Sequence, residues 1–215
     1  MATTQRVEIT APKMETVAFT IRGTSPLVIH AFSRKTREQM KASQEQGDKA
    51  KNRKKREPKD FKALCEGAKH KAADGWCGIP ANALRAGMIS VCRLTGFVMT
   101  RAKLAIFIEA DGFDAEDFTP LVKITKGQPE YFESMVRLSD GSVDISARPL
   151  WKPGWEAVVR VSYDTDQMSR EDIGNLLMRL GRQAGICEGR PNSTNSTGQG
   201  WGLFELVQDK EAKKR

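Results

Sequence analysis

The chain has 215 residues, of which 39% are hydrophobic, and its formal net charge is +8. This length is sufficient for one domain with a substantial core. No window approaches the roughly 20 consecutive apolar residues that a membrane span requires, and the N-terminal stretch has no apolar run. We therefore expect no signal peptide, no membrane association and a cytoplasmic protein. Four scattered cysteines and two histidines, without CxxC spacing, predict free thiols and no metal site.

The positive charge is concentrated in one segment. Residues 34–71 contain 14 Lys and Arg against 6 Asp and Glu, which accounts for the whole excess and leaves the rest of the chain neutral. A localised basic block on a balanced domain indicates a polyanionic partner. Nucleic acid is the first interpretation, and an acidic protein, a membrane surface or a solvated charge run without a partner are the alternatives.

Hydrophobic periodicity predicts the elements of the first half of the chain. Alternation indicates strands, an apolar stripe behind Pro80 indicates a helix, and the basic segment between them has too few apolar positions for a core. In chain order we expect a strand at 16–22 and its extension or a second strand at 27–32. A basic insertion that is partly helical or disordered follows at 33–74, then a helix at 80–95 and a strand at 103–109.

The second half is predicted from turn signals, alternation and a capping box. Ser169 precedes Asp172 by three residues, a spacing that satisfies the free N–H groups at a helix start, and Gly185 is a helix stop. In chain order we expect a β-rich insertion at 110–154, a strand at 155–163 and a helix at 169–184. A glycine-rich loop at 185–200, a short strand at 201–207 and a charged tail at 208–215 complete the chain.

The order of the core elements predicts an α+β fold. Two strand–helix–strand units with right-handed crossovers form a four-stranded antiparallel sheet with two helices on one face. This is the ferredoxin-like (RRM-like) arrangement, here in a single domain over residues 1–215. The long basic insertion follows its first strand, and the β-rich insertion precedes its third.

The glycine-rich loop offers phosphate-binding chemistry. Residues 185–202 expose backbone N–H groups and small hydroxyls beside Arg190, and such groups donate hydrogen bonds to phosphate oxygens without reading a base. A solvated linker is the alternative interpretation. The loop matches neither the P-loop nor the dinucleotide fingerprint, so we expect no nucleotide cofactor.

Three motifs, taken with this layout, resemble the RAMP superfamily (repeat-associated mysterious proteins) of CRISPR effector complexes. They are Gly-Thr-Ser-Pro-Leu-Val-Ile-His at 23–30, Gly-Ile-Pro-Ala-Asn-Ala-Leu-Arg at 78–85, and the loop before the last strand. The layout is most similar to the backbone subunits that polymerise along a guide RNA. The resemblance implies an RNA-recognition-like sheet, self-association along the strand, companion subunits, and finger- or thumb-like insertions. A stand-alone, phage-encoded relative that coats single strands fits the chain length equally well.

We therefore predict a non-catalytic, largely sequence-independent protein that binds single-stranded RNA or DNA and oligomerises along it. Basic residues would contact phosphates, and Trp151 would stack on a base unless it packs in the core. The predicted contacts are Lys51, Arg53, Lys54, Lys55, Arg56, Arg85, Arg148, Trp151, Lys152, Arg190, Ser193, Thr194, Ser196 and Thr197.

Two other functions stay open at this point. Some RAMP processing nucleases use a histidine as general acid or base without a metal, and His30 and His70 are the candidates here. A structural role is the alternative for His30, which ends an apolar strand segment. The acidic run from Asp111 to Asp117 is interpreted as a solvated loop. A basic protein-interaction module is the other possibility.

Overall fold

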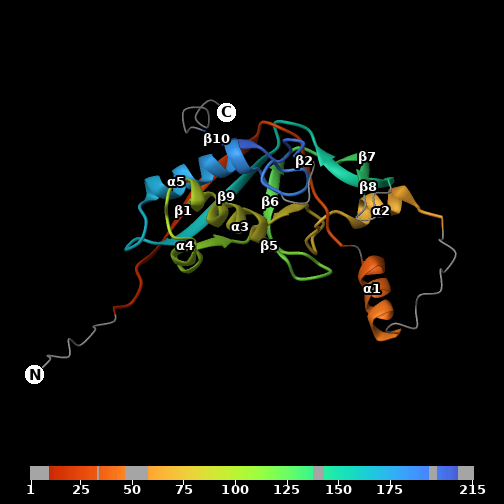
Figure 1. The fold of residues 1–215 in the computed structure, drawn as a ribbon, viewed down its shortest axis with the longest axis horizontal. Helices are drawn as coiled ribbons and strands as arrows, with labels where there is room; N and C mark the ends of the chain where they lie inside the picture. Colours follow the sequence, from red (N-terminus) through yellow and green to blue (C-terminus); the bar gives the residue numbers. More distant parts are fainter. Residues whose placement is uncertain (1–9, 33, 47–57, 138–142, 194–197, 208–215) are drawn as a thin grey trace, which may run out of the picture.

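The computed structural model describes residues 10–32, 34–46, 58–137, 143–193 and 198–207 (Figure 1). The described helices are α1 (Arg34–Gln46), α2 (Phe61–Gly67), α3 (Ala81–Val91), α4 (Met99–Ala105) and α5 (Arg170–Arg179). The strands are β1 (Met14–Gly23), β2 (Leu27–Val28), β3 (Gly78–Pro80), β4 (Ile106–Glu109), β5 (Gly112–Phe113), β6 (Pro120–Lys126), β7 (Glu130–Arg137), β8 (Val143–Trp151), β9 (Glu156–Asp164) and β10 (Phe204–Leu206).

The main sheet is antiparallel and larger than the four strands expected. It has seven strands in the order β10-β1-β9-β6-β3, with β4 also beside β9 and β5 beside β6. The order β10-β1-β9-β4 can be followed within it. The α+β class is confirmed. The sheet is larger because β5 and β6, from the predicted β-rich insertion, and β3, from the approach to α3, join its edge.

Helices α3, α4 and α5 lie on one face of this sheet (Figure 1). The core between them is built from the inward side of β9 and the apolar stripes of α3 and α5, and it includes Val159, Val161, Leu84, Met88 and Leu177. Each such side chain, fully buried, stabilises the fold by roughly 1.5–3 kcal/mol. The alternation predicted for 155–163 is confirmed, since alternate residues of β9 are buried.

The start and stop signals predicted around α5 are confirmed. Ser169 Oγ accepts a hydrogen bond from Asp172 N at 3.1 Å, and the Asp172 carboxylate accepts one from Ser169 N at 2.9 Å. A π-helical turn, Leu180–Ala184, extends the helix. Gly185, with a φ of +69°, ends it in a conformation that favours glycine.

The strand expected at 103–109 is correct only from Ile106. Residues 99–105 form α4 instead, because the small residues Ala102 and Ala105 recur at helical spacing and are buried on one side. Leu104, expected to face the core, is 79% exposed. Alternation over three apolar residues did not distinguish a short helix followed by a strand from one longer strand.

The two predicted insertions form structure of their own. A second sheet has the order β2-β8-β7, and α2 packs on β8 with Cys65 buried. Lys59 binds the Asp144 carboxylate beside it at 2.7 Å. Five of the predicted contacts, Lys51, Arg53, Lys54, Lys55 and Arg56, lie outside the described residues, as does the tail 208–215.

Two expectations from composition can be compared with the structure. All four cysteines are free thiols, as predicted. Among the described residues, no helix combines the length and apolar character needed to cross a membrane.

Candidate nucleic-acid interface

A pocket of about 370 Å³ lies where the end of β2, the start of α3 and the glycine-rich loop meet. It therefore unites the three motifs on which the sequence resemblance rests. Polar and charged side chains from separate parts of the chain line it, namely His30, His70, Asn82, Glu188, Arg190 and Ser193.

The described part of the glycine-rich loop is anchored to the core. Glu188 N donates to Val28 O at 3.1 Å, and Gly202 N donates to Pro26 O at 2.7 Å. Gly202 has a φ of +70°, and a Cβ there would lie 2.0 Å from the Ile186 carbonyl oxygen, so only glycine fits. These constraints favour a preformed binding loop over a solvated linker.

The start of α3 contributes backbone donors to the same pocket. Pro80 is the N-cap residue, and no side chain caps the first turn. Because the first N–H groups of a helix lack partners within the helix, and because the helix dipole is positive at this end, the position favours an anion. Asn82 and Ala83, from this first turn, line the pocket.

His70 is held in place by a buried carboxylate. Its Nδ1 lies 2.8 Å from Asp114 Oδ2, and the two residues are 8% and 5% exposed. This contact corrects the expectation that Asp114 belongs to a solvated loop. The ring is fixed against the wall of the pocket.

His30 lies on the other side of the pocket beside an ion pair. Glu188 Oε2 is 3.1 Å from Arg148 Nε and 3.8 Å from His30 Nδ1. Partial burial of the ring, whose side chain is still 38% exposed, together with the nearby Arg148 guanidinium and His70 ring, lowers the pKa of His30 to about 4. His30 is therefore neutral near pH 7 and can accept a proton or a hydrogen bond there.

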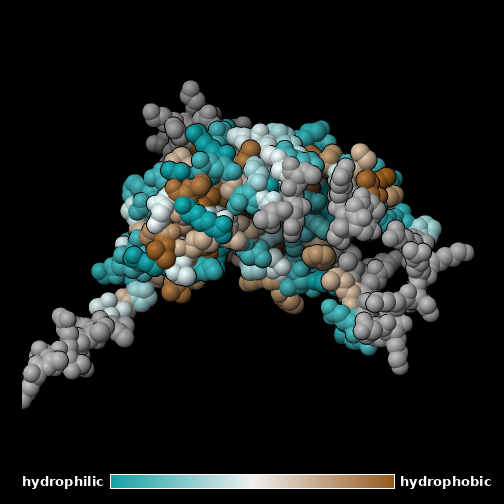
Figure 2. All heavy atoms as spheres, in the orientation of Figure 1, coloured by the Kyte–Doolittle hydropathy of each residue, from teal (hydrophilic) through white to brown (hydrophobic). Residues whose placement is uncertain are grey.

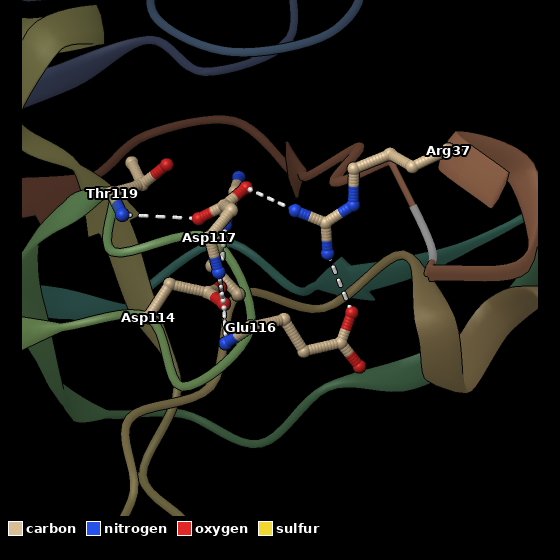
Figure 3. Close-up of polar contacts among 6 residues, drawn as sticks. Arg37, Asp114, Glu116, Asp117 and Thr119 are labelled. Carbon is tan, nitrogen blue, oxygen red and sulfur yellow. Dashed lines mark hydrogen bonds and ion pairs between the residues drawn. The ribbon is translucent and has the colours of Figure 1, made fainter. Parts of the chain in front are cut away.

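One acidic cluster beside the pocket has the donors of a metal site. Ligand atoms of His70, Asp114 and Asp117 lie within 4.8 Å of one another. Figure 3 shows that the carboxylates already have partners: Asp114 accepts from Glu116 N at 2.8 Å, and Arg37 Nη1 lies 3.4 Å from Asp117 Oδ2. Because a guanidinium competes with a cation for Asp117, this arrangement fits a structural role for the cluster, which fixes α1 and His70.

The predicted contacts Arg190 and Ser193 and the alternative catalytic residue His30 all line the pocket. Arg190 Nη1 donates to Cys187 O at 2.8 Å, which holds the guanidinium on the loop. His70, the other alternative catalytic residue, joins them. Thr194, Ser196 and Thr197 lie outside the described residues.

Other predicted residues have structural partners. Trp151 is 1% exposed, so it belongs to the core and has no free ring face for a base. Arg148 is bound to Glu188, and Lys152 pairs with Glu130 at 2.8 Å outside the pocket. Arg85 Nε donates to Ile106 O at 2.8 Å and its guanidinium lies over Phe107, which ties α3 to β4.

Sequence reasoning missed three residues of the site: Asn82, Asp114 and Glu188. Asn82 lies within the helix-opening motif, and that position was a usable signal. Asp114 and Glu188 act through tertiary contacts with His70 and Arg148, at separations of 44 and 40 residues, which no local pattern contains.

Comparisons with known proteins bear on the fold. No protein-family model and no curated protein matches the chain. A chain in the cryo-EM structure of the type III-B Cmr-beta bound to cognate target RNA is similar, with a TM-score of 0.51, 13% identity, and coverage of 91% of this chain and 60% of that one. Cmr6 from Pyrococcus furiosus aligns with a TM-score of 0.45 and 9% identity over 91% of this chain and 98% of its own, too weakly to support an argument.

The chain therefore shares its fold, which is of the α+β class, with the matched Cmr-beta chain. It spans 60% of the length of the matched Cmr-beta chain. At 13% identity the similarity extends to the fold alone.

Proposed function

We propose that this protein binds single-stranded RNA at the pocket between β2, α3 and the glycine-rich loop, without catalysis and largely independently of base sequence. The observation that carries the proposal is the convergence of backbone and side-chain phosphate donors there. The uncapped start of α3 and Arg190, which lies on the loop, line one pocket. Such groups contact phosphate and do not read bases.

RNA is the preferred ligand because a structure with a similar fold is described as bound to cognate target RNA. The basic block of residues 34–71 supplies the long-range attraction to the strand. We further propose that copies of the protein assemble side by side along the RNA, together with companion subunits.

The direct test is the affinity for fluorescein-labelled single-stranded RNA, measured by anisotropy with the wild-type protein and with Arg190→Ala. The variant should bind about tenfold more weakly, since a hydrogen bond to a charged group contributes roughly 1.5–3 kcal/mol. The control is Arg85→Gln, which removes an arginine whose contacts with Lys103 O, Ile106 O and the Phe107 ring lie outside the pocket. Equal losses in both variants would contradict the proposed site.

A second candidate function is metal-independent RNA cleavage, because the structure brings His30 and His70 to the same pocket. Neutral His30 would accept the 2′-hydroxyl proton as that oxygen attacks the phosphorus. The leaving 5′-oxygen would take a proton from His70, whose ring Asp114 positions. Cleavage of end-labelled RNA that is lost in both His30→Ala and His70→Ala would support this function, and intact RNA with the wild-type protein would exclude it.

A further inference from the structure

A groove of about 700 Å³ lies between α5 and the turn that joins α3 to α4. Apolar side chains that line it include Phe97, Met168 and Leu176. Exposed aliphatic residues continue the apolar surface beside it, since Leu94 is 58% and Val98 53% exposed. Figure 2 shows apolar atoms interspersed with hydrophilic ones over α4 and α5.

Arginines surround this apolar surface, and no described carboxylate forms an ion pair with them. Arg179 and Arg182 line the groove, and Arg93 lies on the adjoining turn. Within the described parts of the chain, none of the three forms an ion pair with a carboxylate, although Lys59, Lys152 and others elsewhere on the surface do. The sequence between Gly75 and Ile108 contains no Asp or Glu at all.

The other polar groups at the groove have hydrogen-bond partners of their own. Arg101 Nε donates to the neutral Gln167 side chain at 3.0 Å and its guanidinium lies over the Phe97 ring. Asp172, the carboxylate that lines the groove, accepts hydrogen bonds from Ser169 as part of the capping box.

The combination of apolar side chains and arginines at the groove determines which kind of molecule fits there. A symmetric dimer through this face would bring the arginines of the two copies together, which is repulsive. A nucleic-acid strand would contact the arginines through its phosphates but would leave the exposed aliphatic side chains of Leu94 and Val98 without partners, because bases stack on aromatic faces. An apolar segment flanked by carboxylates matches both the groove and its charge.

We propose that this groove docks a short acidic and apolar segment of a partner protein, with apolar side chains against Phe97 and Met178 and carboxylates on Arg179 and Arg182. The site is distinct from the RNA pocket. The pocket lies at the N-terminal end of α3, and Thr95 and Phe97 of the groove lie beyond its C-terminal end. The inference does not depend on the proposed RNA binding.

The test uses the full chain and a fluorescein-labelled peptide, Glu-Glu-Leu-Leu-Glu-Glu, with its affinity measured by anisotropy. Two control peptides replace either every Glu by Lys or every Leu by Ser. We expect saturable binding of the acidic, apolar peptide alone. The double variant Arg179→Glu/Arg182→Glu should bind it at least about tenfold more weakly, because its carboxylates would then face like charges.

The matched control is Lys62→Glu/Lys123→Glu, which changes the net charge equally at exposed positions outside the groove and should retain the affinity. Val98→Ser removes apolar surface without a change of charge and should also weaken binding. Circular dichroism checks that each variant is folded.

Three results would overturn the proposal. They are absence of saturable peptide binding, equal affinity in the groove and control variants, and displacement of the peptide by single-stranded RNA. Self-association of the wild-type protein that Arg179→Glu/Arg182→Glu abolishes, seen by sedimentation, would identify a second copy as the occupant instead.

Discussion

The two ends of α3 bear two different kinds of surface. At its N-terminal end, tight backbone geometry shapes the pocket, and its cations have partners already: Arg148 binds Glu188, and Arg190 binds the Cys187 carbonyl oxygen. At its C-terminal end, Arg179 and Arg182 line an apolar groove without carboxylate partners in the described structure. A pocket of fixed shape fits the regularly spaced phosphates of a polyanion. Arginines around aliphatic side chains fit a protein segment that has both carboxylates and apolar side chains. The difference shows that net charge alone does not identify a ligand.

The largest expected effect tests whether the pocket is rigid. Gly202→Ala places a Cβ 2.0 Å from the Ile186 carbonyl oxygen and also strains a positive φ. We expect a loss of more than about 3 kcal/mol in the free energy of unfolding, because backbone on both sides resists the shift. Urea denaturation measures it.

Gly200→Ala is the matched control for this substitution. Its φ is also positive, at +77°, but nothing lies within 4 Å of the added Cβ. The free energy of unfolding of Gly200→Ala should therefore fall by only roughly 1 kcal/mol, which is the cost of the backbone strain. Equal losses in the two variants would mean that the close packing of the loop contributes nothing, and the pocket would not be preformed.

The next largest effect is expected on the RNA affinity, and it separates long-range electrostatic attraction from local contacts in the pocket. Neutralising Lys54, Lys55 and Arg56 together should weaken RNA binding equally for all sequences. The slope of log K against log salt should fall by about 2, at roughly 0.7 for each phosphate contact to a single strand. A salt titration of the anisotropy measures it. A sequence preference that survives with an unchanged slope would show that these cations do not contact the strand.

Glu188→Gln should change the RNA affinity in the opposite direction. Its carboxylate neutralises Arg148 and lies in the pocket, where it repels phosphate. Removing that charge should tighten RNA binding, while the same substitution leaves peptide binding to the groove unchanged. Weaker RNA binding would show that the carboxylate positions Arg148 for the ligand.

A pH effect of intermediate size comes from His30. Its pKa falls from 6.5 to about 4 on folding, so the folded protein binds fewer protons there than the unfolded chain. Stability associated with this residue is therefore present above pH 6.5 and is lost as the pH falls toward 4. His30→Asn should lose less stability than the wild type over that range, as urea denaturation at a series of pH values would show. Identical pH profiles would contradict the lowered pKa of His30.

The smallest effect is expected at Lys152, which was a predicted contact. Its side chain is 71% exposed and pairs with Glu130 outside both surfaces. Lys152→Ala should change the free energy of unfolding by less than about 1 kcal/mol, typical of an exposed pair, and should leave RNA affinity unchanged. A clear loss of RNA affinity would extend the interface to β8.

The sequence predicted the parts of this structure that depend on local patterns. β1, β9 and α5 follow from alternation and from the Ser169–Asp172 spacing, and Gly185 ends the helix as expected. The glycine-rich loop was recognised from composition. Its anchoring to Pro26 and Val28 was not, because those hydrogen bonds join residues far apart in sequence.

The predicted site was least accurate where a side chain's role depends on burial. Arg148, Trp151 and Lys152 alternate cation and aromatic ring in the sequence, but around the end of β8 they occupy different environments. Trp151 is in the core, Arg148 is bound to Glu188, and Lys152 is in solvent. Composition cannot separate these outcomes, since the face of a strand that is buried depends on which elements pack against it.

The most direct test of the RNA pocket is photo-crosslinking of the full chain to single-stranded RNA that contains 4-thiouridine, followed by mass spectrometry of the crosslinked peptides. We predict crosslinks within residues 186–193 and 79–83, which line the pocket, and their loss in Arg190→Ala. Crosslinks confined to α5 and residues 93–98, around the groove, would contradict the central claim.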